Sequence, residues 1–148
     1  MTIDRKGTVV VGVDGSPDSG RALDWAIDEA IKRHLRVRLV HGVEVGVSMA
    51  SPYGGGMVLE QLEEAGRTVL DEAEERVRAA GLDVDSCLEI GSGAHALIEQ
   101  SKDADLLVVG CRGHGGFVGM LLGSVSSAVT HHAHCPVLVV RPEHSTLA

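Results

Sequence analysis

The residues best suited to chemistry lie between Gly110 and Ser126, where six glycines fall between positions 110 and 123. Glycine lets backbone N–H groups approach a phosphate closely and adopts positive φ without strain. Ser124 and Ser126 follow at the start of a helical pattern, where the first N–H groups are unpaired and the helix dipole is positive. A simple turn needs far fewer glycines, so the stretch predicts an anion-binding cradle that does not depend on lysine.

Three better-known phosphate-binding designs do not fit this chain. A Walker loop places lysine directly after its last glycine, whereas Ser124 follows Gly123 here. A dinucleotide fingerprint would follow the first strand, and the residues around Gly12 and Gly15 lack its spacing. A phosphoacceptor receiver domain would need acidic residues at several strand ends and a lysine after the last strand, where Arg141 stands.

Asp14 and Gly42 are further candidates because each stands where an expected strand ends. Ligands of open α/β sheets bind outside the carboxyl ends of the strands, so both residues and Val13 should border the crevice. Asp14 precedes a glycine, and this pair is also typical of turns, which makes a turn carboxylate the alternative. We expect Asp14 to contact the ligand.

Two other groups carry weaker indications. His131, His132, His134 and Cys135 suggest a metal site, but histidine is favoured at helix C-termini and no second ligand pair is evident. Cys111 lies in the glycine-rich loop and would be a redox switch only as an exposed thiol of low pKa. We expect a small packed side chain there, no metal site and no catalytic residue.

Apolar runs alternate with amphipathic stretches along the chain, which predicts parallel strands joined by helices. The expected strands are Thr8–Val13, Val37–Val43, Leu82–Ile90, Asp105–Val109 and Pro136–Val140. The expected helices are Pro17–His34 with Ser16 as N-cap, Val58–Ala80, a short helix around Ala96–Ile98, and Ser124–His132, while residues 44–56 are expected to form a loop. The buried stripe of the second helix is expected to include Leu62, Ala65, Val69, Ala73, Val77 and Ala80.

This order predicts an α/β fold over residues 1–148, taken as one domain. The fold is a doubly wound open sheet of five parallel strands, in the order 3-2-1-4-5, with helices on both faces. With an aromatic share of 2%, its core must be built from Val, Leu, Ile and Ala.

Composition excludes several function classes. A formal net charge of −8 argues against nucleic-acid and anionic-membrane partners, which require an excess of Lys and Arg. The 3 cysteines have no paired spacing, which favours a reducing compartment. The first residues have no apolar signal-peptide core, and no apolar run reaches the length of a membrane span. We expect a cytoplasmic protein.

From Val9 to Arg141 the chain resembles the universal stress protein family, in its ATP-binding branch. The family spacing of Gly, two residues, Gly, nine residues, Gly and then Ser or Thr matches Gly110, Gly113, Gly123 and Ser124. The opening run that ends at Asp14 and the closing run through Cys135 to Arg141 are also similar to the family.

The resemblance implies ATP as the ligand, with Asp14 at the ribose or adenine and the Gly42 backbone at the adenine edge. The residues implied for the ribose and phosphates are Gly110, Arg112, Gly113, Gly123, Ser124, Val125 and Ser126. Arg112 would add charge to the phosphates or point to solvent. Gly42 departs from the β-branched residue common in the family, which would reduce apolar contact with the base. The resemblance also implies a homodimer through Val137–Val140, an exposed strand edge.

The function expected is a regulatory module that responds to ATP, with Mg²⁺ entering only through the phosphates. The alternatives are a slow ATPase or nucleotide-transfer enzyme, and a sensor whose ligand is AMP or ADP. Against an enzyme, the chain offers no phosphate-binding lysine and only His114 in the loop as a base.

Overall fold

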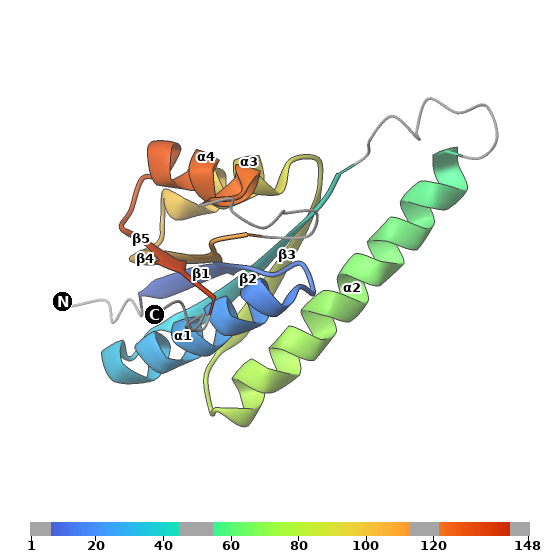
Figure 1. Cartoon of the computed structure of the whole chain (residues 1–148). Coiled ribbons are helices and arrows are strands. Elements are labelled where there is room, and N and C mark those ends of the chain that lie inside the picture. Colours follow the sequence, from blue (N-terminus) through green and yellow to red (C-terminus); the bar gives the residue numbers. More distant parts are fainter. Residues whose placement is uncertain (1–6, 45–54, 113–121, 143–148) are drawn as a thin grey trace, which may run out of the picture.

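The computed structural model describes residues 7–44, 55–112 and 122–142 (Figure 1). In chain order the elements are β1 (Thr8–Gly12), α1 (Pro17–Arg33), β2 (Arg36–Val43), α2 (Gly55–Ala79), β3 (Val84–Ile90), α3 (Gly93–Ser101), β4 (Leu106–Gly110), α4 (Ser124–His132) and β5 (Val137–Val140). The strands form one parallel sheet in the order β3-β2-β1-β4-β5. The predicted fold class and strand order are confirmed.

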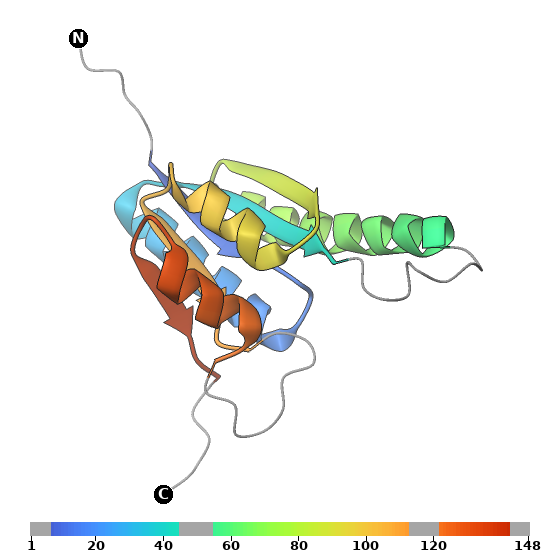
Figure 2. The same cartoon turned by 90° about the horizontal axis from the view of Figure 1, so that it is seen from above.

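The sheet is covered on both faces, by α1 and α2 on one side and by α3 and α4 on the other (Figures 1 and 2). Successive residues of β1 therefore enter different cores: Val9 and Val11 pack toward α1 and α2, and Val10 packs toward α3 and α4. A strand buried on both faces has no polar side, which explains its unbroken valine run. Among the described residues the buried apolar core contains Val, Leu, Ala and Cys but no aromatic side chain.

Helix α1 begins and ends as its sequence predicts. Ser16 is the N-cap, and its Oγ accepts the Ser19 N–H at 3.2 Å. Pro17 occupies the first helical position, where its missing N–H costs nothing. His34 closes the helix in the left-handed region with φ 57°.

Helix α2 differs from the prediction at its start and along its buried face. It begins at Gly55, inside the predicted loop, because glycine is tolerated where the first helical N–H groups are unpaired. Its N-terminal part projects beyond the sheet (Figure 2), which leaves Leu62 and Ala65 exposed. The buried positions described are Gly66, Leu70, Ala73 and Val77.

None of the described helices has both the length and the apolar character that a membrane span requires.

Strand β3 is an edge strand, and this explains its acidic residues. Asp85 and Ser86 are exposed, so their polar side chains stay in water. Arg38, on β2, lies opposite Asp85 of β3, and its Nε donates a hydrogen bond to Asp85 Oδ1 at 2.9 Å. This hydrogen bond raises the pKa of the Arg38 guanidinium. The strand begins at Val84, because the preceding residues form the turn out of α2.

Candidate nucleotide site

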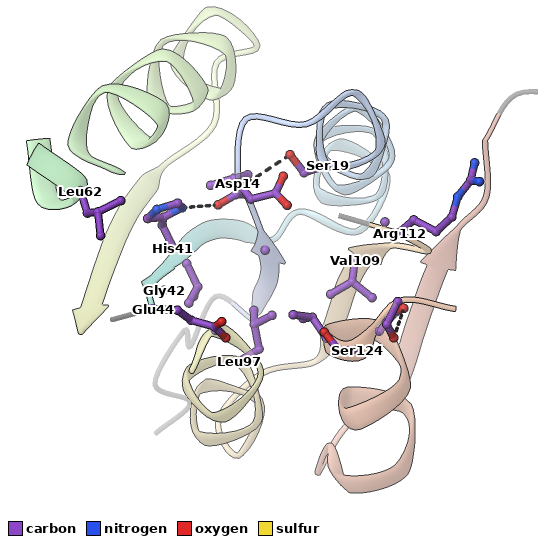
Figure 3. Close-up of a pocket in the computed structure, with 18 residues that line it drawn as sticks. Asp14, Ser19, His41, Gly42, Glu44, Leu62, Leu97, Val109, Arg112 and Ser124 are labelled. Atoms are coloured by element: carbon purple, nitrogen blue, oxygen red, sulfur yellow. Dashed lines mark hydrogen bonds between the residues drawn. The ribbon is translucent and has the colours of Figure 1, made fainter. Parts of the chain in front are cut away.

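A pocket of about 510 Å³ lies at the carboxyl ends of β1, β2 and β4 (Figure 3). In a parallel sheet these ends share one edge, so segments distant in sequence meet there. The predicted site residues that line the pocket are Val13, Asp14, Gly42, Gly110, Arg112, Gly123, Ser124, Val125 and Ser126. Gly113 lies outside the described residues, as does His114.

Asp14 forms a turn, and it also lines the pocket. Its Oδ1 accepts the Ser16 N–H at 2.9 Å, and its own N–H donates to Ser19 Oγ at 3.2 Å. Gly15 between them has φ 83°, a conformation that favours glycine. The turn fixes the Asp14 backbone while the residue lines the pocket (Figure 3).

The opposite end of the pocket is formed by the N-terminus of α4. Gly123 is the N-cap and supplies no side-chain hydrogen bond, so the first N–H groups of the helix lack a side-chain cap. Ser124, the first helical residue, is exposed and lines the pocket. Uncapped N–H groups and the positive end of a helix dipole are features suited to an anion.

Ser126 has a structural role that the sequence did not suggest. It is 2% exposed, and its hydroxyl donates to the Cys111 carbonyl at 2.7 Å. The Gly123 N–H donates to the same carbonyl, at 2.6 Å. Both contacts join the two ends of the glycine-rich loop. Because a hydroxyl has one proton, that proton is engaged within the protein and the backbone remains the group that Ser126 offers a ligand.

Arg112 is tied to Asp18 on α1. The buried Asp18 Oδ2 accepts the Arg112 N–H at 3.2 Å and lies 3.7 Å from its Nε. Arg21 pairs with the other carboxylate oxygen. In Figure 3 the Arg112 side chain extends away from the other labelled residues. Of the two orientations considered for Arg112, the structure therefore has the guanidinium turned from the pocket centre.

Close backbone packing accounts for two of the predicted glycines. A Cβ on Gly110 would lie 2.8 Å from the Asp18 carbonyl group, and a Cβ on Gly42 would lie 2.5 Å from the Cα of Gly93. Neither neighbour is a flexible side chain, so only glycine fits without displacement of α1 or α3. Gly42 thus lets the N-terminus of α3 rest on β2 beside the pocket.

The remaining walls include residues that were not in the predicted site, among them Ser19, His41, Glu44, Leu62 and Leu97. Leu62 was assigned to a buried stripe and instead reaches the pocket from α2 (Figure 3). His41 carried a signal, because it directly precedes Gly42 at a strand end. Asp18 also carried one, as an acidic residue in the first turn of a helix.

Arg112 is the one Lys or Arg among the described residues that line the pocket, which also contains Asp14 and Glu44. Within the described ranges no group of three or more His, Cys, Asp or Glu side chains is placed to hold a metal ion. His131 and His132 are exposed at the end of α4. Cys111 is 1% exposed, and the cysteines are free thiols. Among the described residues, the polar groups that this pocket offers are suited to hydrogen bonding.

The chain is similar to proteins of one known family. The model of the universal stress protein family matches residues 7–141. A universal stress protein of Mycobacterium tuberculosis is 39% identical over 94% of the chain, and one of Bacillus subtilis is 33% identical over 90% of it. The match covers 49% of the mycobacterial protein and 97% of the Bacillus protein, so the chain spans about half the length of the mycobacterial relative.

A solved structure described as a universal stress protein in complex with cAMP has the same fold. It aligns with a TM-score of 0.69 and 33% identity, over 90% of this chain and 96% of that one.

Proposed function

Because the chain belongs to the universal stress protein family, we propose that it is a regulatory module that binds an adenine nucleotide, with ATP as the first candidate. The observation that carries the proposal is the pocket itself. It is bordered at one end by the α4 N-terminus and at the other by strand ends and apolar side chains. Its volume of about 510 Å³ suits a mononucleotide. The relative solved with cAMP supports an adenine nucleotide as the ligand.

We assign the phosphates to the α4 end, because the backbone N–H groups from Ser124 to Ser126 and the Ser124 hydroxyl lie at the helix N-terminus and can donate to an anion. Gly110, Arg112 and Gly113 are assigned to the same end, and Val125 to the ribose side. The base is assigned to the Gly42 backbone, near Leu97 and Leu62, where the wall is apolar. Val13 and Asp14 are assigned to the ribose, because the Asp14 carboxylate can accept hydrogen bonds from ribose hydroxyls.

The proposal also includes how many phosphates the bound nucleotide carries. Arg112 is paired with Asp18, so little cationic charge is available for a triphosphate. ATP would therefore enter with Mg²⁺ held by its own phosphates, whereas AMP would need no metal. The N–H groups at the start of α4 can serve either nucleotide, so AMP and ADP remain the alternatives.

Regulation is favoured over catalysis by the side chains available. Of the described residues that line the pocket, the one histidine is His41, which lies beside Gly42 at the end assigned to the base and not at the α4 end assigned to the phosphates. Slow ATP hydrolysis or nucleotide transfer would depend on His114. We further propose that the chain forms one cytoplasmic domain, which dimerises through the open edge of β5 without nucleic-acid or membrane partners.

Nucleotide binding is tested first by mass spectrometry of small molecules released from the purified protein, followed by calorimetry with ATP and AMP. Near-stoichiometric ATP would support a slowly exchanging sensor. AMP alone would favour the AMP alternative, and ATP turnover lost in His114→Ala would favour the enzyme. Absence of binding by any adenine nucleotide would overturn the proposal.

The phosphate assignment is tested by Ser124→Asp against Ser124→Asn. Aspartate at the first position of α4 favours the helix dipole, so folding is maintained while the added charge repels phosphate. We expect the Kd for ATP to rise about tenfold or more in Ser124→Asp and to change little in Ser124→Asn. Equal affinities in two folded variants would place the phosphates elsewhere.

A further inference from the structure

The imidazole of His41 supplies a hydrogen bond at the point where β1 ends. Its Nδ1 lies 2.7 Å from the Val13 carbonyl oxygen (Figure 3), across 28 positions of sequence. A carbonyl oxygen only accepts hydrogen bonds, so Nδ1 must carry the proton and donate. In the neutral ring this makes Nε2 the unprotonated nitrogen.

The Val13 carbonyl lies just beyond the regular ladder between β1 and β2. The last paired residues are Gly12 and Val40, and the Val13 N–H still donates to the Val40 carbonyl at 3.0 Å. Val13 is 5% exposed, so its carbonyl would be costly to leave unpaired. The His41 side chain therefore extends the ladder by one bond, immediately before Asp14.

Helix α2 makes room for this imidazole at Gly66. A Cβ on Gly66 would lie 2.6 Å from His41 Cδ2 and 2.9 Å from Leu88 Cδ1. Glycine is unfavourable inside a helix, so its presence here is explained by the ring packed against it. A Cβ on Gly20, inside α1, would meet no neighbouring atom within 4 Å, so this glycine offers a matched comparison.

We propose that His41 is a positioning residue of the nucleotide site. Its Nδ1–H holds the Val13 carbonyl, which sets the point at which the chain leaves β1 and so the place of the Asp14 carboxylate in the pocket. Gly66 keeps the ring in that position. The inference rests on the proposed nucleotide binding and adds to it a contact that runs from α2 through β2 to β1.

The test compares three substitutions of His41 by calorimetry with ATP and AMP. In His41→Asn the amide nitrogen branches from Cγ as Nδ1 does, so the bond to Val13 is kept. In His41→Gln the amide lies one carbon further out, and in His41→Leu the donor is lost at similar volume. We expect affinity to fall about tenfold in the Leu and Gln variants and to recover in the Asn variant. Equal affinity in all three folded variants would overturn the proposal.

A second comparison uses the two helical glycines. Gly66→Ala should weaken nucleotide binding by displacing the ring, whereas Gly20→Ala should leave binding unchanged. Unchanged affinity in Gly66→Ala would remove Gly66 from the proposal.

Nitrogen NMR of the wild-type imidazole provides a readout that needs no nucleotide. Protonation at Nδ1 in the neutral ring is expected, and protonation at Nε2 alone would overturn the contact. If the wild type shows the expected tautomer but binds no adenine nucleotide, the proposed function fails while the anchoring of Val13 stands.

Discussion

Asp18 was not predicted as a site residue, yet it holds Arg112, which was. It is 8% exposed and accepts the backbone N–H of Arg112 while pairing with the guanidinium groups of Arg112 and Arg21. The carboxylate thus anchors the first described turn of the glycine-rich loop to α1. Because this carboxylate is largely removed from water, we expect its loss to cost more stability than the loss of one partner of a surface ion pair.

Asp18→Asn is expected to lower the free energy of unfolding by about 1–3 kcal/mol, because two guanidinium groups lose their counter-charge. Asp28→Asn is the matched control, since Asp28 is exposed on the same helix, where it pairs with Lys32. That change should stay within about 0.5 kcal/mol. Urea unfolding of the two variants measures the difference, and equal losses would contradict the anchoring role.

The thiols supply a prediction that depends on pH. Burial, with a smaller effect of Glu89, raises the pKa of the Cys87 thiol, and burial, with Asp105, raises the pKa of the Cys135 thiol. The folded chain therefore favours the protonated thiols, and this preference is lost as the pH rises through their raised pKa values. Rates of alkylation at Cys87 and Cys135 should rise at higher pH in the folded chain than in the chain unfolded by urea.

Peptide mass spectrometry after timed alkylation would locate the two midpoints. Cys111 is 1% exposed and should stay unmodified while the chain is folded. A Cys87 midpoint at or below that of the unfolded chain would show that burial does not control this thiol.

At the scale of elements, the contact between β2 and α3 depends on a pair of glycines that are not equivalent. The Cβ of a residue at position 42 would point at the Gly93 backbone, whereas a Cβ at position 93 would lie 3.9 Å from the Gly42 backbone, at ordinary van der Waals distance. Position 42 therefore tolerates no side chain without a shift of α3, while position 93 does. Position 42 has glycine instead of the β-branched residue common in the family, and α3 approaches β2 closely at this position.

Gly42→Ala should destabilise the fold by about 1–3 kcal/mol through overpacking, and it should also weaken nucleotide binding because the displaced α3 borders the pocket. Gly93→Ala should be neutral or stabilising by a few tenths of a kcal/mol, as ordinary glycine replacements in a helix are. Thermal unfolding and calorimetry on both variants test the asymmetry. A Gly93→Ala loss as large as that of Gly42→Ala would contradict it.

At the scale of the whole molecule, the strand order places the candidate site. The chain moves outward from β1 to β3 and then returns to β4 on the other side of β1, so β1 and β4 are neighbours whose connections leave in opposite directions. A crevice opens at such a point, and Asp14 and Gly110 border it from the two strands. Among the described residues no further strand pairs with β3 or β5, the two outer strands, and β5 is the edge proposed for dimerisation.

The sequence by itself determined local features of the structure. The valine run of β1, the Ser16–Pro17 helix start and the glycine-rich stretch before α4 each have a signal within a few residues, because strand and helix periods and cap chemistry are properties of neighbouring positions. The alternation of these elements also predicted parallel strands with right-handed crossovers, and the order 3-2-1-4-5 is a common one for doubly wound sheets.

Only the tertiary structure decided which side chains meet across elements. Asp18 and Arg112 are 94 positions apart, and His41 and Val13 are 28 apart. Their contacts depend on strand register and on the angle at which each helix crosses the sheet, which no local pattern encodes. The same reason explains Leu62: its spacing is that of a buried stripe, but α2 extends beyond the sheet there, so the side chain borders the pocket instead of the core.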